Sequence, residues 1–210
     1  KWVDSDSVND ESASEIFSDC SGIILPGGFG NRGIEGMISS CKYARLHNIP
    51  YFGICLGMQI AVIEFARDVL NLKNANSTEF DEQCENPVID LMKDQEGVIK
   101  GGTMRLGKYP CRVKSRTIMQ KAYGAVTIEE RHRHRYEFNN NFRSKMEEAG
   151  LIIGGTSPDD SIVETVELPQ KDSAISHKFF IGVQFHPEFK SRPNNAGPLF
   201  VEFLKACINY

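Results

Sequence analysis

The stretch YFGICLGMQIAVIEF, residues 51–65, passes from a strand pattern directly into a helix pattern. Its first four residues favour a strand, and the apolar residues between Met58 and Val69 then recur on one helical face. A strand that turns at once into a helix is typical of α/β sheets, where the turn lies at the carboxyl edge that binds ligands. Cys55 occupies this turn, with Gly53 two residues before it and Gly57 two residues after it.

Strands and helices alternate along the rest of the chain. A buried-type strand is expected at residues 22–25, ending at Pro26, and helical spacing runs over 34–47 and stops before Pro50. Further strands are expected at 87–91, 102–106, 110–113, 126–138, 151–153, 162–168 and 179–185, and further helices at 140–150 and 199–208. The predicted fold class is α/β, with three layers, a mostly parallel central sheet flanked by helices, and a small antiparallel sheet.

Composition argues against several classes of function. The 210 residues carry a formal net charge of -4, which does not favour binding to nucleic acid or to an anionic membrane. No apolar run approaches the roughly 20 residues of a membrane span. The six cysteines are scattered without a CxxC pair, so we expect free thiols in a reducing, cytoplasmic compartment.

Cys55 is the first candidate for chemistry. A residue at this turn also lies at the start of a helix, where unpaired amides and the helix dipole stabilise an anion. We therefore expect a lowered thiol pKa and a nucleophilic thiolate. Gly-x-Cys-x-Gly is the cysteine counterpart of the serine nucleophile elbow, a tight turn that tolerates little side-chain bulk. The alternative is a small buried hydrophobic residue, the role expected of the other five cysteines.

A thiolate that attacks an acyl group needs a proton shuttle, and His186 is the candidate. It follows the apolar strand 179–185, so it too lies at a strand end. Glu188, two residues later, can fix the tautomer and orientation of the imidazole. Taken alone, His186 could be a loop histidine beside a carboxylate. Together with the turn at Cys55, it predicts a nucleophile–base–orienter triad.

Glycines after the strand 22–25 suggest an oxyanion hole. In Pro26-Gly27-Gly28-Phe29-Gly30, backbone N–H groups can approach a ligand closely. The amides of Gly28 and Leu56 together could hold a tetrahedral oxyanion, and loss of one such donor typically costs about 10²- to 10³-fold in rate.

Two nucleotide-binding motifs occur in incomplete form. Gly28-x-Gly30-x-x-Gly33 spells the dinucleotide fingerprint, but no acidic residue follows about 20 positions later. Residues 102–108 nearly spell a P-loop, but Tyr109 replaces the required Ser or Thr, and Pro110 stands where a helix should begin. Neither motif predicts a nucleotide site.

A basic segment, Glu-Arg-His-Arg-His-Arg-Tyr-Glu, occupies residues 130–137. In a strand its arginines 131, 133 and 135 would share one face, and His132, His134 and Tyr136 the other. Three interpretations remain open: a solvated charged strand, a zinc site that lacks a third ligand, and an arginine clamp for a carboxylate or phosphate.

Three blocks of the sequence resemble the class I (triad) glutamine amidotransferases: PGGFG at 26–30, GICLGMQ at 53–59 and QFHPEF at 184–189. Narrower blocks at 74–80, 101–107 and 130–137, together with GGFGNRG at 27–33, resemble the amidotransferase domain of CTP synthases. The resemblance extends from about Val3 to Leu204. It implies a flavodoxin-like amidotransferase fold, and a glutaminase domain over residues 1–210 that belongs to a longer chain.

The resemblance implies a reaction and a set of residues. Cys55 attacks the side-chain amide of glutamine, ammonia leaves, and water then releases glutamate from a glutamyl thioester. His186 shuttles protons, Glu188 orients it, and Gly28 and Leu56 form the oxyanion hole. The implied glutamine-binding residues are Gly28, Phe29, Leu56, Gly57, Met58, Gln59, Glu79 for the α-amine and Arg135 for the α-carboxylate. The implied lid comprises Gly101, Gly102, Thr103, Met104, Arg105, Leu106 and Gly107.

The resemblance also implies partners outside this sequence. In the complete enzyme, an N-terminal synthetase domain uses the ammonia to convert UTP to CTP with ATP and Mg²⁺, and GTP activates the glutaminase near the lid. That synthetase domain is not in the sequence, so no cofactor and no metal are expected in residues 1–210. The complete enzyme is expected to be a homotetramer, and this piece a monomer.

Two other functions compete with an active glutaminase. A glutamine-binding regulatory module would keep the pocket but turn over little in isolation, for want of GTP and the synthetase domain. A γ-glutamyl cysteine hydrolase would share the triad, but Glu79 and Arg135 match free glutamine better.

Overall fold

The computed structural model describes residues 1–91 and 104–208. Its strands are β1 Ile23–Leu25, β2 Tyr51–Ile54, β3 Ala75–Ser77, β4 Asn86–Leu91, β5 Arg105–Val113, β6 Thr127–His134, β7 Tyr136–Phe138, β8 Ile152–Thr156, β9 Val163–Glu167 and β10 Phe180–Val183. Its α-helices are α1 Ala13–Phe17, α2 Ile34–Leu46, α3 Leu56–Asp68, α4 Ile118–Tyr123, α5 Arg143–Glu148 and α6 Pro198–Ile208. Short 3-10 turns lie at η1 Ser5–Ser7, η3 Asn140–Phe142 and η4 Pro187–Phe189.

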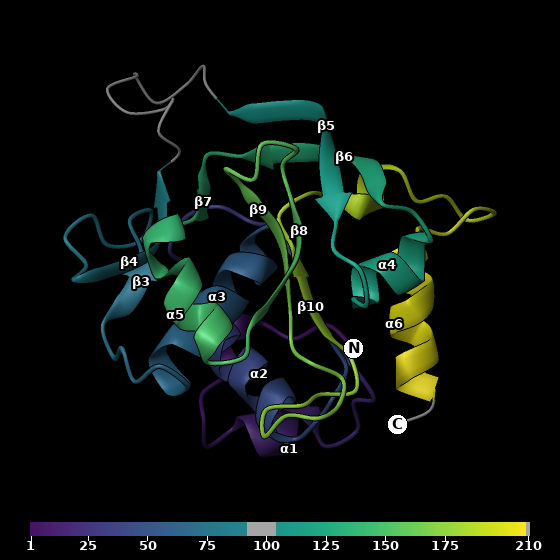
Figure 1. Cartoon of the computed structure of the whole chain (residues 1–210). Helices are drawn as coiled ribbons and strands as arrows, with labels where there is room; N and C mark the ends of the chain where they lie inside the picture. The colour runs from purple at the N-terminus through teal and green to yellow at the C-terminus, as the bar shows by residue number, and fades with distance from the viewer. Residues whose placement is uncertain (92–103, 209–210) are drawn as a thin grey trace.

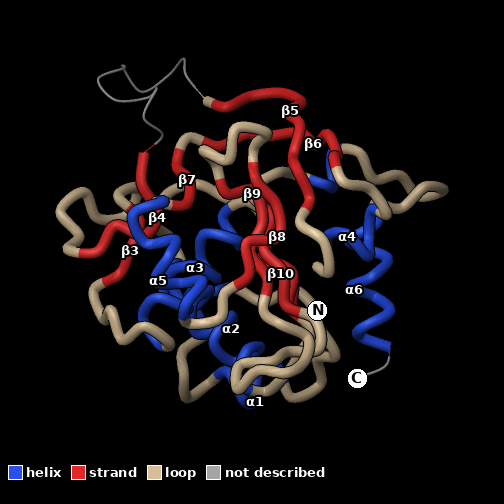
Figure 2. The backbone as a smooth tube through the Cα atoms, in the orientation of Figure 1, coloured by secondary structure: helices blue, strands red, loops and turns tan. Residues whose placement is uncertain are grey.

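The strands form two sheets. A seven-stranded sheet runs in the order β1-β2-β10-β9-β8-β5-β6, and a three-stranded sheet, in the order β3-β4-β7, lies beside it (Figure 2). The α/β fold class is confirmed, but the main sheet is mixed rather than mostly parallel. β2 pairs in parallel with β1 and β10, whereas β10–β9, β9–β8, β8–β5 and β5–β6 are antiparallel. The small sheet is also mixed, because β3 and β4 are parallel and β4 and β7 antiparallel.

Hydrophobic side chains cover both faces of the main sheet. Figure 1 shows α2 and α3 on one side of it and α4 and α6 on the other. Tyr51 and Phe52 of β2 are both fully buried, and they belong to the cores on opposite faces because successive strand residues point to opposite sides. None of the helices in residues 1–91 and 104–208 is long and apolar enough to cross a membrane.

The parallel half of the sheet places three loops at one edge. β2 lies between β1 and β10, with Gly53 in register with both Leu25 and Gly182. Because the three strands run in the same direction, the segments that follow them leave at the same edge. These segments are the glycine-rich run after β1, Cys55 after β2, and the run from Gln184 to Glu188 after β10.

Two strand predictions are corrected by the structure. β5 is one continuous strand where two were predicted, and Pro110 is tolerated in it because the pairing with β8 begins only at Arg112. The strand predicted over 126–138 is interrupted at Arg135, where the chain leaves the main sheet and enters the small one. The short elements α1, α4 and β3 were not predicted, because each is only a few residues long.

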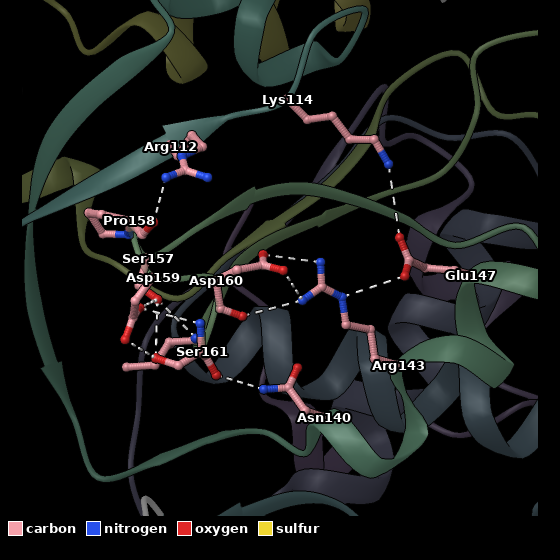
Figure 3. A network of polar contacts seen from close by, with 11 residues as sticks. Arg112, Lys114, Asn140, Arg143, Glu147, Ser157, Pro158, Asp159, Asp160 and Ser161 are labelled. Carbon is pink, nitrogen blue, oxygen red and sulfur yellow. Dashed lines mark hydrogen bonds and ion pairs between the residues drawn. The ribbon is translucent and has the colours of Figure 1, made fainter.

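The turn between β8 and β9 is tied to neighbouring elements by polar side chains (Figure 3). Arg143 of α5 pairs with Asp160 at 3.2 Å, and Arg112 of β5 donates to the Pro158 carbonyl at 2.5 Å. Such exposed contacts contribute little to stability individually. They do fix the turn against β5 and α5, and with it the start of β9.

A buried carboxylate holds the start of α4. The Glu167 side chain, on β9, accepts hydrogen bonds from Ile118 N at 2.6 Å and Met119 N at 2.9 Å. The residue is 1% exposed, and burial raises the pKa of its carboxyl to about 7 in spite of these two donors. The carboxylate therefore replaces the missing backbone acceptors of the first turn.

We expect Glu167→Ala to lower the free energy of unfolding by about 2–3 kcal/mol, because two buried amides lose their acceptor. Urea unfolding at neutral pH measures this change. Glu148→Ala, which removes an exposed glutamate from α5, is the control and is expected to change stability by less than about 0.5 kcal/mol. Equal stabilities for the two variants would contradict the capping role.

Candidate active site

Cys55 joins β2 to α3 in a strained backbone conformation, with φ 51° and ψ -99°. A non-glycine residue adopts positive φ only where surrounding contacts hold it there. Cys55 N donates to the Val183 carbonyl at 2.7 Å, and the Cys55 carbonyl accepts from Met58 N at 3.1 Å and Gln59 N at 3.2 Å. Bonds on both sides of the turn thus fix the thiol, which is 3% exposed, at the sheet edge.

The two flanking glycines are required by close backbone contacts. A Cβ added at Gly53 would lie 2.5 Å from the carbonyl carbon of Gly57. A Cβ added at Gly57 would lie 2.3 Å from the carbonyl oxygen of Leu25 in β1. Real Cβ atoms do not approach backbone this closely, so any side chain at either position would push α3 away from the sheet. These close contacts explain why the residues two positions before and after Cys55 carry no side chain.

His186 lies at the end of β10 with its ring oriented by two neighbours. Its Nδ1 is 2.6 Å from Glu188 Oε1, and its ring stacks on Phe189 with 4.6 Å between centroids. Its Nε2 is buried and has no hydrogen-bond partner among the described residues. The geometry leaves one ring nitrogen fixed by a carboxylate and the other available for proton transfer.

Gly27 lies close to both Cys55 and His186. A Cβ added at Gly27 would lie 2.7 Å from His186 Cε1 and 3.5 Å from Cys55 Cβ. The glycine therefore occupies the narrow space that borders both side chains, and only the absence of a side chain leaves that space open. The run after β1 thus contributes to the geometry of the triad candidates, a role that the sequence did not predict.

The expected lowering of the Cys55 pKa is wrong for the resting protein. Burial raises the pKa of the thiol to about 12, and Glu188 and Glu79 add to the increase. The backbone N–H of Leu56 and the side chain of Gln184 act in the opposite direction but do not outweigh burial. The thiol is therefore protonated in the resting protein, and it must give its proton to a base as it reacts.

Two buried glutamines connect the thiol to the other side of the pocket. Gln184 Nε2 donates to Cys55 Sγ at 3.6 Å, and Gln59 Nε2 lies 3.3 Å from Gln184 Oε1 and 3.0 Å from the Tyr136 carbonyl. Gln59 was predicted as a site residue, whereas Gln184 was not. Its position directly after β10 and two residues before His186 is the signal that could have revealed it.

A cavity of about 290 Å³ opens beside Cys55. Its walls come from the loop after β1, the start of α3, the loop after β3 and the junction of β6 with β7. The lining residues are Gly28, Phe29, Gly30, Cys55, Gln59, Glu79, Met104, His134, Arg135 and Tyr136. The cavity is large enough for a small amino acid, and its walls include charged side chains.

The charged residues that line the cavity are one carboxylate and one guanidinium. Glu79, half-buried after β3, accepts a hydrogen bond from Gly30 N at 3.0 Å. Arg135 lies at the break between β6 and β7, and its Nε is buried without a hydrogen-bond partner among the described residues. The strand interpretation predicted that Arg135 shares a face with Arg131 and Arg133. This is wrong, because Arg131 and Arg133 are exposed whereas Arg135 lines the cavity. An amino acid with its carboxylate toward Arg135 and its amine toward Glu79 would match these charges.

Five of the eight predicted glutamine-binding residues line this cavity, namely Gly28, Phe29, Gln59, Glu79 and Arg135. The backbone of Gly57 lies against β1, and the Met58 side chain packs against Gly182 of β10, so both residues serve the fold. Leu56 contacts Gly28, because a Cβ added at Gly28 would lie 2.9 Å from Leu56 Cδ2. Gly30, His134 and Tyr136 line the cavity and were not predicted.

The structure describes only part of the predicted lid. Its first three residues, Gly101, Gly102 and Thr103, lie outside the described residues. Met104 lines the cavity, whereas Arg105, Leu106 and Gly107 form the start of β5 rather than a loop. Arg105 is buried and pairs with Glu164 of β9 at 2.6 Å. Residues 1–91 and 104–208 contain no group of three or more histidine, cysteine or acidic side chains that could hold a metal ion.

Comparison with known proteins identifies a family and relatives that match nearly the whole chain. The family model for glutamine amidotransferase class-I matches residues 2–206. CTP synthase of Staphylococcus aureus (strain JH9) is 53% identical over 211 aligned residues, which cover 100% of this chain and 38% of the relative. The chain therefore spans well under half of the curated relatives that it matches.

Solved structures agree. The glutaminase domain of Trypanosoma brucei CTPS with bound acivicin superposes with a TM-score of 0.91 at 38% identity, covering 100% of this chain and 80% of that one. A glutamine amidotransferase from Thermotoga maritima, at 16% identity and a TM-score of 0.51, covers 81% of this chain and 57% of that one and shares the fold.

The mixed sheet, the cysteine elbow and these matches define a class of protein: the chain belongs to the class-I glutamine amidotransferase family. Within that family it is the counterpart of the glutaminase domain of CTP synthase.

Proposed function

We propose that this chain hydrolyses L-glutamine to glutamate and ammonia through Cys55, His186 and Glu188. The observation that carries the proposal is one cavity lined both by the fixed thiol of Cys55 and by the opposite charges of Glu79 and Arg135. Glutamine carries an amide at one end and an amino-acid group at the other. Its α-carboxylate would pair with Arg135 and its α-ammonium with Glu79, which directs the amide toward Cys55.

The reaction follows from the proton inventory of the site. Cys55 Sγ forms a bond to the amide carbon while its proton passes to His186 Nε2, and the N–H groups of Gly28 and Leu56 hold the resulting oxyanion. The carbon–nitrogen bond then breaks, and the leaving nitrogen takes the proton from His186 to depart as ammonia. Water adds to the thioester with His186 as base, and glutamate leaves as the thiol is restored. Glu188 keeps Nδ1 of His186 in a fixed orientation throughout.

We place this reaction in a larger assembly on the strength of the relatives. Residues 1–210 would be the glutaminase domain of a longer, cytoplasmic chain whose N-terminal synthetase domain uses the ammonia for ATP- and Mg²⁺-dependent amination of UTP to CTP. GTP would activate the glutaminase near residues 101–107. The complete enzyme would be a homotetramer, and this piece alone a monomer.

One observation favours the second function, a glutamine-binding module with little turnover in isolation. The thiol has a raised pKa in the resting protein, so its reactivity depends on how well glutamine and His186 are arranged. Without the synthetase domain and GTP, that arrangement would be reached less often. This alternative shares the pocket with the active glutaminase and differs only in rate.

Intact-mass measurement after incubation with a diazoketone analogue of glutamine tests the pocket and the thiol together. We expect a single adduct on Cys55, prevented by excess glutamine, with acivicin as a second probe. Cys55→Ala should give no adduct and Cys41→Ala the full adduct. A folded protein that gives no adduct, or one that glutamine does not prevent, would contradict the proposed function.

A further inference from the structure

A chain of buried polar groups runs from β9 to the glutamine pocket. His132 Nε2 lies 3.5 Å from Glu164 Oε2, His132 Nδ1 lies 3.0 Å from His134 Nε2, and His134 Nδ1 lies 3.1 Å from the Tyr136 carbonyl. Glu164 is 0% exposed and each histidine 2%. The proposed reaction uses none of these three side chains.

The geometry of these contacts shows how many protons the two imidazoles and the carboxyl group must carry. The Tyr136 carbonyl can only accept, so His134 Nδ1 must carry the proton. A neutral His134 then has a bare Nε2, which requires a proton on His132 Nδ1. A neutral His132 in turn has a bare Nε2 facing Glu164 Oε2, and neither atom has a hydrogen-bond partner among the described residues. Three contacts therefore need three protons, and two neutral imidazoles supply only two.

We propose that Glu164 and His132 share one additional proton in the resting protein, and that it holds both histidines in the tautomer that fixes the Tyr136 carbonyl in the glutamine pocket. Glu164, His132 and His134 are then positioning residues, because none of them touches the thiol. The inference rests on the proposed function, since it concerns the binding of glutamine at the same site.

The Tyr136 carbonyl connects the chain to the substrate pocket. It also accepts from Gln59 Nε2 at 3.0 Å, and Gln59 continues through Gln184 to the sulfur of Cys55. Gln59, His134 and Tyr136 all line the cavity. A change at His134 therefore alters the pocket wall and the support of Gln59.

The surroundings of the shared proton make it sensitive to pH. Arg105 Nη1 of β5 donates to Glu164 Oε1 at 2.6 Å, Tyr109 packs edge-on to His132, and Cys111 and His186 are the other titratable groups that act on the pair. Burial raises the pKa of Glu164 to about 7, against the attraction of Arg105. Burial, with Arg105 next, lowers the pKa of His132 to about 2 and that of His134 to about 3. Both imidazoles therefore stay neutral, and the additional proton is lost as the pH rises through the Glu164 pKa.

Loss of that proton reverses the direction of the hydrogen bonds between Glu164, His132 and His134. The ionised Glu164 attracts a proton onto His132 Nε2, so His132 Nδ1 becomes an acceptor and His134 must donate through Nε2. His134 Nδ1 then faces the Tyr136 carbonyl without a proton, and the contact at the pocket is lost. Glutamine binding is therefore expected to weaken above neutral pH.

Binding of glutamine by calorimetry, in a Cys55→Ala background that removes turnover, tests this inference. Between about pH 6 and pH 8.5 we expect the Kd to rise about three- to tenfold, the range for one lost hydrogen bond. Glu164→Gln is the decisive variant, because its amide donates permanently to His132 Nε2 while its oxygen still accepts from Arg105. It should bind as the parent does at pH 6 and change less than about twofold over that range.

Glu167→Gln is the matched control, since Glu167 lies on the same strand and is equally buried but contacts α4. It should keep the pH dependence of the parent, and this comparison removes the contribution of glutamine's own amine. Nitrogen-15 NMR of the imidazoles gives an independent readout. The parent should show both histidines protonated at Nδ1 near pH 6 and at Nε2 above about pH 8, whereas Glu164→Gln should keep Nδ1 protonated throughout.

The possible failures can be told apart. The same pH dependence of Kd in Glu164→Gln and the parent, or ring tautomers that do not change with pH in the parent, would overturn the inference and leave the proposed function standing. A folded Cys55→Ala protein that binds no glutamine at any pH would overturn the proposed function, and the inference with it.

Discussion

Replacing Cys55 by alanine is expected to lower the rate of glutamate release by at least about 10⁴-fold, the scale seen when the nucleophile of a triad is removed. The sulfur forms the thioester in the proposed reaction, and an alanine methyl group cannot. The fold should persist, because the hydrogen bonds that hold this turn are made by the backbone of residue 55. An enzyme-coupled glutamate assay measures the rate, and circular dichroism with urea unfolding checks the fold.

Cys41→Ala is the matched control for this experiment. Cys41 is fully buried in α2 and packs in the core on one face of the main sheet. It does not line the cavity beside Cys55. The same sulfur atom is deleted, so any loss of stability from a smaller side chain appears in both variants. Glutamate release should be unchanged in Cys41→Ala. Full activity in Cys55→Ala would show that the triad is wrongly assigned.

Arg135→Ala is expected to raise the KM for glutamine about 100-fold, with a much smaller change in kcat. The proposed pair between Arg135 and the α-carboxylate is desolvated, and truncating one partner of such a pair costs about 2–5 kcal/mol. Stability should change by less than about 1 kcal/mol, because the buried Nε has no protein partner to lose among the described residues. Steady-state kinetics over a wide range of glutamine concentrations separate KM from kcat.

Arg131→Ala is the control for charge. Arg131 lies four residues earlier, on β6, and its side chain is exposed, so the variant loses the same formal charge without changing the cavity. Its KM should stay within about twofold of the parent. Equal increases in KM for both variants would indicate a general effect of charge and would contradict a specific clamp by Arg135.

Local rules were sufficient to predict the turn at Cys55. A strand pattern that changes into a helix pattern within one residue leaves few conformations, and the flanking glycines follow from the closeness of β1 and α3. The segments after β1 and β10 were placed beside it because parallel strands end at one edge. These predictions needed only neighbouring residues and the direction of strands.

The pKa of Cys55 could not be predicted in the same way. A helix N-terminus lowers the pKa of a thiol, and that part of the argument can be made from sequence. Burial acts in the opposite direction, and it depends on packing by β10, Gln184 and other segments that are distant along the chain. Which effect prevails is therefore a property of the assembled fold.

The position of Arg135 shows a second limit of sequence patterns. Alternation over residues 126–138 is regular, so it predicts one strand with three arginines on a face. The residues before and after Arg135 belong to different sheets, and pairing partners decide this rather than alternation. Resemblance to relatives identified Arg135 as a site residue, but only the break in the strand explains why its side chain lines the cavity.

The residues of the pocket come from the ends of strands in two different sheets. Cys55 and His186 stand at the edge of the main sheet, whereas Glu79 follows β3 of the small sheet and Arg135 is the single residue between β6 and β7. In the proposed reaction, bond breaking and recognition of the amino-acid end are thus carried by different structural units. Mutations in the small sheet can change which amino acid is selected while the chemistry is preserved, so the two properties can evolve independently in a domain of this design.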